Sequence, residues 1–177
     1  MPNRILVVYY TRTGTTQQLA RWIAAALDGD LERIVDRTRR TGVLGYLRSG
    51  YEAGLQRLVP IEPPVRDPTQ YDLVVVGTPI WNASVSSPVR SDLEAHRNEM
   101  RKVAFFCTCG GRGDKRTFGQ MTDVCGVAPI ATLAVRESTI EDCAPAVERF
   151  AAEIGQRLAA APPPFAAGPS PATPPPH

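Results

Sequence analysis

Residues 9–16 read YYTRTGTT, and this stretch decides how the chain begins to fold. An apolar run from Ile5 to Tyr10 stops there at hydroxyl side chains grouped around one glycine. A helical pattern follows at once, from Gly14 to Leu27. The order strand, tight turn, helix places a helix N-terminus at the end of a buried strand. Unpaired N–H groups and the helix dipole favour an anion at that place.

The turn has the composition of a phosphate site. Its hydroxyl donors are Thr11, Thr13, Thr15 and Thr16. Gly14 lets the backbone pass close to a phosphate, and Arg12 adds a cation. The Gly-x-x-x-x-Gly-Lys-Ser/Thr and Gly-x-Gly-x-x-Gly patterns are absent, so a single terminal phosphomonoester fits better than a nucleoside triphosphate or a dinucleotide pyrophosphate. The alternative is an ordinary helix start, with the threonines serving only as caps.

Composition restricts the class of protein. The chain has 177 residues, 43% of them hydrophobic, which suits one soluble domain, and its formal net charge is +2. No nucleic-acid motif accompanies the basic residues, and the apolar run from Ile5 to Tyr10 is too short for a signal peptide or a membrane span. Four cysteines without metal spacing or a Cys-x-x-Cys pair predict reduced thiols in a cytoplasmic protein without a metal site.

The rest of the chain repeats the strand–helix pattern. Predicted strands are Arg4–Tyr10, Leu31–Val35, Tyr71–Gly77, Lys102–Cys107 and Val127–Val135; predicted helices are Gly14–Leu27, Val85–Arg97, Thr117–Val124 and Pro145–Ala160. Such alternation with short loops predicts an α/β fold, a doubly wound five-stranded parallel sheet between two helix layers. We expect the strand order 2-1-3-4-5.

Residues 1–160 are predicted to form this domain, and the Pro/Ala-rich residues 161–177 a disordered tail. Residues 38–60 are an insertion in the second helix. Leu47, Tyr51, Leu55 and Leu58 repeat there at helical spacing, although glycines interrupt the pattern. The insertion is either a connecting helix, or a lid or homodimer contact.

Three strand-to-helix loops are expected to meet at one edge of the sheet, since the first, third and fourth strands are neighbours. They are residues 11–16, 78–82 and 108–114. Trp81 would contact a planar ligand there, unless it folds back onto the edge of the domain. Pro79 stiffens the second loop, and Asn82 tolerates a left-handed backbone. The glycines of the third loop would offer N–H donors, unless that loop is an ordinary turn.

Three motifs resemble the flavodoxin family over residues 4–160: Thr11-x-Thr13-Gly14-x-Thr16, Gly77-Thr78-Pro79-Ile80-Trp81, and Thr108-x-Gly110-Gly111. The resemblance implies bound FMN, with its phosphate in residues 11–16 and its ring between residues 79–82 and 108–113. The implied cofactor-binding residues are Thr11, Arg12, Thr13, Gly14, Thr15, Thr16, Thr78, Pro79, Ile80, Trp81, Asn82, Thr108, Cys109, Gly110, Gly111 and Gly113. No side chain is expected to act as a catalytic acid or base.

The chain also departs from the family. Low-potential flavodoxin carriers are strongly acidic, whereas this chain is nearly neutral, and Arg12 adds a cation that the family often lacks in its phosphate loop. Residues 108–114 contain no aromatic to cover the second face of a flavin; Tyr46 or Tyr51 would take that part if the insertion is a lid. Cys109 is expected near the ring as a small loop residue rather than a redox group, and Cys107 in the core.

The predicted function is electron transfer through a non-covalently bound FMN, with a redox partner protein docking to the flavin. The alternative is an NAD(P)H-dependent FMN oxidoreductase acting on a quinone or a similar acceptor, protoporphyrinogen oxidation included. A third alternative is a flavin-free protein that keeps the fold, against which the threonine-rich loop argues.

Overall fold

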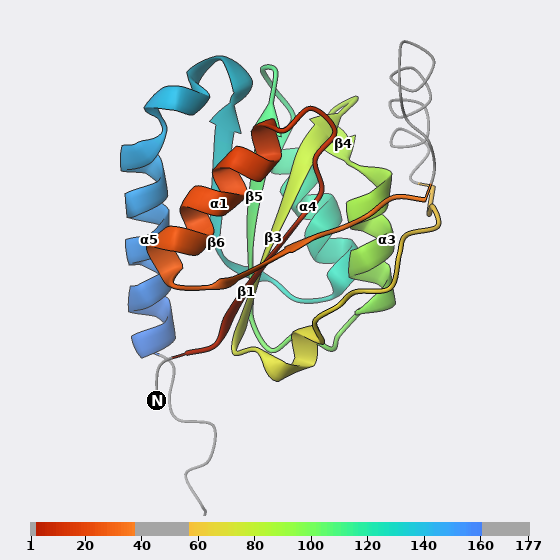
Figure 1. Ribbon diagram of the computed structural model, residues 1–177, viewed down its shortest axis with the longest axis horizontal. Coiled ribbons are helices and arrows are strands. Elements are labelled where there is room, and N and C mark those ends of the chain that lie inside the picture. The colour runs from red at the N-terminus through yellow and green to blue at the C-terminus, as the bar shows by residue number, and fades with distance from the viewer. Residues whose placement is uncertain (1–2, 38–56, 161–177) are drawn as a thin grey trace, which may run out of the picture.

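The computed structural model describes residues 3–37 and 57–160. A central sheet lies between helices on both faces (Figure 1). The elements are β1 (Ile5–Tyr9), α1 (Thr15–Leu27), β2 (Asp30–Arg33), η1 (Pro68–Gln70), β3 (Leu73–Trp81), β4 (Ser84–Val85), α3 (Ser87–Ala95), β5 (Val103–Cys109), α4 (Asp114–Cys125), β6 (Pro129–Arg136), η2 (Glu137–Asp142) and α5 (Ala144–Ala159).

The main sheet has the order β2-β1-β3-β5-β6, and every neighbouring pair along it is parallel. Val7 of β1 pairs with Leu31 of β2 on one side and with Val75 of β3 on the other. Because β5 and β6 are the fourth and fifth strands of the predicted set, the predicted order 2-1-3-4-5 is confirmed. The sequence did not predict β4, a short strand that pairs antiparallel with the end of β3.

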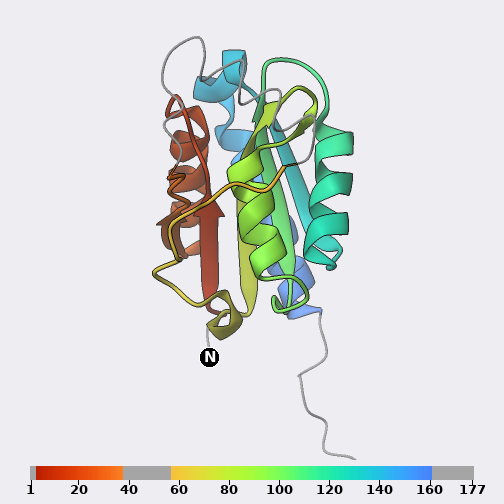
Figure 2. The ribbon, with the colours of Figure 1, turned by 90° about the vertical axis from the view of Figure 1, so that its right-hand side faces the viewer.

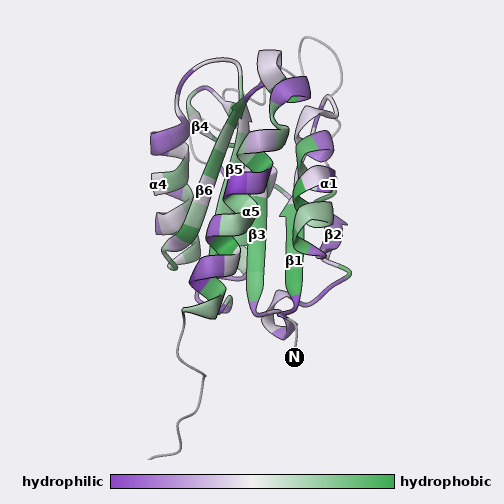
Figure 3. Cartoon of the chain, turned by 90° about the vertical axis from the view of Figure 1, so that its left-hand side faces the viewer, coloured by the Kyte–Doolittle hydropathy of each residue, from purple (hydrophilic) through white to green (hydrophobic). Residues whose placement is uncertain are grey.

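Two apolar cores separate the three layers. Figure 1 shows the layers from the edge of the sheet, and Figure 2 looks onto the side that carries α3 and α4. Helices α1 and α5 cover one face of the sheet, where Val7, Val75 and Phe106 are completely buried. Helices α3 and α4 cover the other face, where Val76 and Phe105 are completely buried. Strands covered on both faces are apolar along their whole length, which is the pattern that Figure 3 shows for β1 and β3.

Gly77 is required by the packing between β3 and β5. A Cβ atom at this position would overlap the ring of Phe106, which fills the space beside the glycine. The backbone of Gly77 also accepts a hydrogen bond from Tyr10 N–H at 3.2 Å. The glycine therefore holds the carboxyl ends of β1, β3 and β5 together.

The structure corrects two predicted strand ends. Strand β3 runs to Trp81 instead of Gly77, and β5 runs to Cys109 instead of Cys107. Residues 78–81, 108 and 109 therefore belong to strands and not to loops. The physical reason is pairing, because Ile80 and Trp81 pair with β4 while Thr108 and Cys109 pair with β6.

Most of the predicted insertion and all of the predicted tail lie outside the described residues. The segment that emerges at residue 57 runs along α3, where Val59 N–H donates to Ser91 Oγ at 2.8 Å. A bridge between Asp36 and Ile61 brings the segment against the chain that follows β2. In the ranges 3–37 and 57–160, no helix is both long enough and apolar enough to cross a membrane.

Candidate functional site

The three predicted segments meet at the carboxyl edge of the sheet, at the top of Figure 1. Thr16 Oγ1 in the first turn of α1 lies 2.8 Å from Thr108 Oγ1 near the end of β5. A Cβ atom on Gly113, before α4, would lie 2.9 Å from the Cα atom of Ala83 at the tip between β3 and β4. These two contacts join all three segments into one surface.

The turn between β1 and α1 has a defined geometry. Gly14 N–H donates to Thr11 Oγ1 at 3.0 Å, and Gly14 itself has φ 100°, a conformation that favours glycine. Gly14 is also the N-cap of α1, and no side chain caps this helix. The N–H groups of the first turn of α1 are therefore available for an anion.

The threonines of this turn divide into two pairs. Thr11 and Thr16 are buried, at 4% and 1% exposure, and their hydroxyls bond to Gly14 N–H and to Thr108. Thr13 is exposed and Thr15 is half-buried, so both reach the surface of the turn. The first pair therefore shapes the turn, while the second pair offers donors to a ligand.

This donor set fits a phosphomonoester. Thr13, Thr15, the half-buried Arg12 and the N–H groups of a helix start all belong to the turn and first residues that follow β1. Helix N-termini and guanidinium groups both favour a dianion. A Cβ atom built on Gly14 would meet no atom within 4 Å, so the turn borders open space.

The tip between β3 and β4 differs from the expected loop. Trp81 is only 9% exposed, and its ring meets Tyr10 edge-on, with ring centres 5.5 Å apart and planes at 89°. Thr78 is completely buried, and its Oγ1 accepts a hydrogen bond from Ser86 N–H at 3.1 Å, which supports the start of α3. Both side chains therefore stabilise the fold.

Three other residues of the second motif lie close to the tip. Asn82 is exposed and has φ 48°, the left-handed backbone that the sequence predicted it to tolerate. Ile80 is half-buried and Pro79 is buried. Asn82 and Ile80 are therefore the members of this motif best placed to meet a ligand, and contact through Trp81 would be limited to the exposed edge of its ring.

The loop between β5 and α4 provides an open backbone. Gly110 and Gly111 are exposed, and a Cβ atom on either would meet no atom within 4 Å. Their N–H and carbonyl groups can be approached closely by a flat ligand.

The two cysteines of β5 have no charged role. Cys107 is completely buried, and burial raises the pKa of its thiol. Burial also raises the pKa of the Cys109 thiol, although a hydrogen bond from the backbone of Gly111 opposes that shift. Both thiols are therefore uncharged near neutral pH, and packing accounts for their presence.

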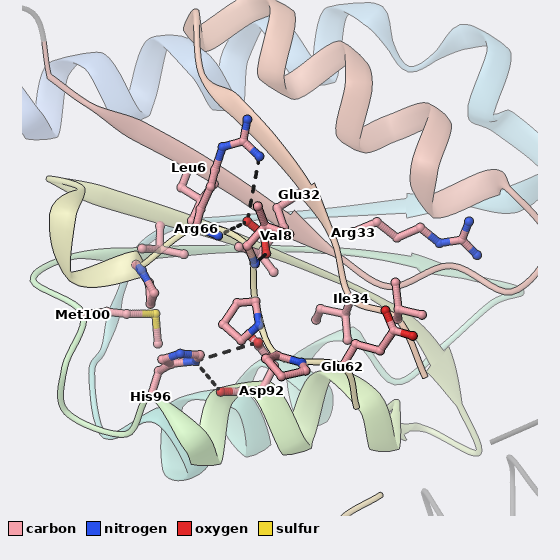
Figure 4. A pocket seen from close by; sticks show the side chains of 16 residues that line it. Leu6, Val8, Glu32, Arg33, Ile34, Glu62, Arg66, Asp92, His96 and Met100 are labelled. Carbon is pink, nitrogen blue, oxygen red and sulfur yellow. Dashed lines mark hydrogen bonds and ion pairs between the residues drawn. The ribbon is translucent and has the colours of Figure 1, made fainter. Parts of the chain in front are cut away.

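A separate cavity of about 70 Å³ lies on the α3 side of β1 and β2 (Figure 4). Asp92 is 8% exposed there, and burial raises its pKa to about 6. This value already includes a lowering by His96, whose Nδ1 lies 3.8 Å from Asp92 Oδ1, and a smaller raising by Glu32. The side chain of His96 is only 16% exposed and faces Asp92.

This cavity is too small for a flavin. Its volume corresponds to about two water molecules, whereas ligand pockets occupy several hundred cubic ångströms. Glu32 has a structural role beside it, since its carboxylate accepts hydrogen bonds from Val65 and Arg66 N–H at 2.7 and 2.9 Å. No local signal could have revealed this cluster, because Glu32, Asp92 and His96 meet only in the folded chain.

A sequence model described as flavodoxin matches residues 4–137. Among solved structures, a flavoprotein from Lactobacillus acidophilus NCFM in complex with FMN superimposes with a TM-score of 0.67 at 20% identity, covering 79% of this chain and 97% of that one. A protein from Bacteroides eggerthii DSM 20697 described as a flavoprotein gives a TM-score of 0.68 at 24% identity, covering 82% and 98%. Oxidised Flavodoxin 2 from Bacillus cereus gives 0.54 at 17% identity, covering 87% and 99%. No match was found among curated proteins.

Proposed function

The chain belongs to the flavodoxin family, and on that premise we propose that it binds FMN non-covalently at the carboxyl edge of its sheet and transfers electrons through the flavin. The observation that carries the proposal is the turn between β1 and α1. It combines an uncapped helix start, a glycine with φ 100° and two accessible threonines at the end of the first strand.

The phosphate end of FMN would be held by the α1 turn. Thr13 and Thr15 would donate their hydroxyls, and the first-turn N–H groups of α1 would donate along the helix axis. Arg12 would balance the second negative charge of the phosphate. Thr11 and Thr16 would act indirectly, since their own bonds hold the turn in shape.

The ring end would lie between Asn82 and the loop Gly110–Gly113. The left-handed backbone at Asn82 turns the chain at the tip, and a backbone group there would meet the ring. Exposed glycines on the other side allow close approach of N–H donors. The L. acidophilus flavoprotein of the same fold was solved in complex with FMN, which supports FMN as the cofactor.

Bound FMN would supply one- and two-electron chemistry, and the protein would bind, orient and tune it. Apart from Arg12, the polar groups of the proposed cofactor-binding residues are hydroxyls, backbone groups, the Asn82 amide and a neutral thiol. We therefore assign no acid or base to the chain, and the residues of the edge serve to position the cofactor.

The test is an absorbance spectrum from about 300 to 550 nm of the protein purified and then incubated with FMN. We expect a flavin spectrum for the wild type and at least a tenfold loss of FMN affinity in Thr13→Ala/Thr15→Ala, since two charge-assisted hydrogen bonds disappear. Thr132→Ala, at an exposed position of β6, is the matched control and should bind FMN normally. Unchanged affinity in the double variant would refute the phosphate assignment.

A second candidate function is an FMN oxidoreductase that takes electrons from NAD(P)H and passes them to a quinone or similar acceptor. Arg112, Lys115 and Arg116 favour it, because they are exposed cations that follow Gly110 and Gly111 in the chain. Anaerobic addition of NADH or NADPH to the FMN-loaded protein separates the two functions. Rapid bleaching of the flavin spectrum supports the oxidoreductase, and an unchanged spectrum supports a carrier served by a partner protein.

A further inference from the structure

The cavity between β1, β2 and α3 is lined by a buried carboxylate that receives no hydrogen bond within the described part of the chain (Figure 4). Asp92 lines the cavity and is more than nine-tenths buried. Its ion-pair partner is His96, but His96 Nδ1 donates to the backbone carbonyl oxygen of Asp92 at 3.0 Å. The same Nδ1 remains 3.8 Å from Asp92 Oδ1, which is too long for a hydrogen bond. A buried carboxylate is normally stabilised by donors, so this one suits a ligand that brings donors of its own.

The charged groups around the cavity favour a cation over an anion. Burial raises the pKa of Asp92, and the nearby buried Glu32 adds to that effect, so two carboxylates act on the same space. Glu62 contributes a third carboxylate at the exposed outer wall. Of the two arginines that line the cavity, Arg66 pairs with Glu32 at 4.0 Å, and the side chain of Arg33 points away from the cavity in Figure 4.

The remaining wall limits the size and the chemistry of a ligand. Leu6, Val8, Val74 and Met100 are buried there and form an apolar surface. The volume of about 70 Å³ is the space of about two water molecules. Residues 63–65 of the outer wall are exposed, so the cavity lies close beneath the surface. A ligand of two or three heavy atoms with one apolar end fits these limits.

A metal ion suits the cavity less well than an organic cation. Among residues 3–37 and 57–160, no group of three or more His, Cys, Asp and Glu side chains is arranged to hold a metal ion. Both oxygens of Glu32 already accept hydrogen bonds from Val65 and Arg66 N–H. One available carboxylate suits a ligand that donates hydrogen bonds and needs no shell of several oxygen ligands.

We propose that this cavity binds a small protonated primary amine, whose ammonium group donates to the Asp92 carboxylate and whose short alkyl part lies against Leu6 and Met100. An ammonium group has three donors and one positive charge, so it satisfies the buried carboxylate and offsets its charge. Water also donates, but it carries no charge to offset that of two carboxylates. The inference goes beyond the proposed function and does not depend on FMN.

Methyl NMR of the full chain labelled with methyl-¹³C methionine tests the proposal. Met100 lines the cavity, while Met121 of α4 is completely buried away from it and serves as an internal reference; Met100→Leu assigns the signal. Methylammonium chloride at about pH 7.5, where the amine is protonated, should shift the Met100 signal saturably and leave Met121 in place. We expect half-saturation in the millimolar range, which a ligand of two heavy atoms can reach.

Two salts at the same ionic strength are the ligand controls. Potassium chloride should give no saturable shift, because K⁺ donates no hydrogen bond. Tetramethylammonium chloride should give none either, because this cation has no N–H group and is larger than the cavity.

The decisive variant is Asp92→Asn, with Glu94→Gln at an exposed position of the same helix as its matched control. Asparagine keeps the shape and removes the charge, and the variant should fold because an ionised carboxylate is disfavoured at this buried position. An unchanged Met121 signal would show that it does fold. The affinity for methylammonium should fall by at least about tenfold in Asp92→Asn and stay unchanged in Glu94→Gln.

Three results would overturn the proposal. The first is the absence of a saturable shift in the wild type, which would mean that the cavity takes up water alone. The second is an equal shift with either control salt, which would indicate an alkali metal ion or a general effect of salt. The third is an unchanged affinity in Asp92→Asn, which would place the amine elsewhere. None of these results depends on flavin content, so the proposed function is tested separately.

Discussion

Asp92 is an acidic residue in a buried environment. Its carboxyl group is 8% exposed, at the edge of a cavity that Leu6, Val8 and Met100 also line. Burial raises its pKa to about 6, from the 3.8 of an unperturbed group. The folded state therefore holds the proton more tightly than the unfolded chain does, and ionisation of Asp92 opposes folding.

This shift predicts a pH dependence of stability. The contribution of Asp92 is fully present below about pH 4 and is lost as the pH rises through about 6, on the order of 1–3 kcal/mol of unfolding free energy. Asp92→Asn should remove that part of the dependence, because an amide does not ionise. Urea unfolding at several pH values between 4 and 7 measures it, with the exposed Asp123→Asn as control. Parallel curves for wild type and Asp92→Asn would show that the site does not carry the effect.

At the scale of elements, one hydrogen bond connects the start of α1 to the end of β5. Thr16 and Thr108 are each 1% exposed, and their hydroxyl oxygens lie 2.8 Å apart. Without this bond, the buried hydroxyl groups of Thr16 and Thr108 would lose the hydrogen bond that they make to each other. The bond therefore fixes the helix start that the proposed phosphate site needs.

Single and double substitutions should show this coupling. Thr16→Val keeps the shape but leaves the Thr108 hydroxyl unsatisfied, which should lower the unfolding free energy by about 1–3 kcal/mol. Thr16→Val/Thr108→Val should recover most of that loss, since neither partner then remains polar. Denaturant titration of the four proteins gives the interaction free energy. Losses that simply add in the double variant would mean that the two hydroxyls act independently.

The same elements show what the sequence could and could not predict. The apolar runs of β1, β3 and β5 and the helical spacing of α1 and α5 are local patterns, so these elements and their parallel arrangement could be predicted from the sequence. The ends of β3 and β5 depend on partners far away in sequence. Pro79 and Asn82 are typical of a loop, yet pairing with β4 keeps Trp81 within β3.

The place of the candidate site in the fold could be predicted from the sequence. Which of its threonines shape the turn and which face a ligand could not. Parallel strands place their following segments at one edge, and the contacts between Thr16 and Thr108 and between Gly113 and Ala83 agree with that. Which threonines face a ligand depends on burial in the folded domain. Thr11 and Thr13 look alike in the sequence, but Thr11 is 4% exposed whereas Thr13 is an exposed residue.

At the scale of the whole molecule, two helix layers hold the strands whose ends form the proposed site. Rigid strands carrying short turns preorganise a ligand site, so little of the binding free energy is lost in ordering the edge. Helix α1 packs on the same core as α5, and α3 on the same core as α4. Binding at the edge should therefore stabilise the domain as one unit.

This linkage gives a prediction for the whole domain that also isolates the phosphate. A ligand at about one hundred times its dissociation constant adds about 2.7 kcal/mol to stability, which for a domain of this size raises the melting temperature by about 5–10 °C. We expect FMN to reach this shift and riboflavin, which lacks the phosphate, to give a clearly smaller one at equal concentration. In Thr13→Ala/Thr15→Ala the FMN shift should fall to the riboflavin value, while the riboflavin shift stays unchanged. Equal shifts for FMN and riboflavin in the wild type would mean that the turn between β1 and α1 does not bind the phosphate, even if the flavin ring does bind at this edge.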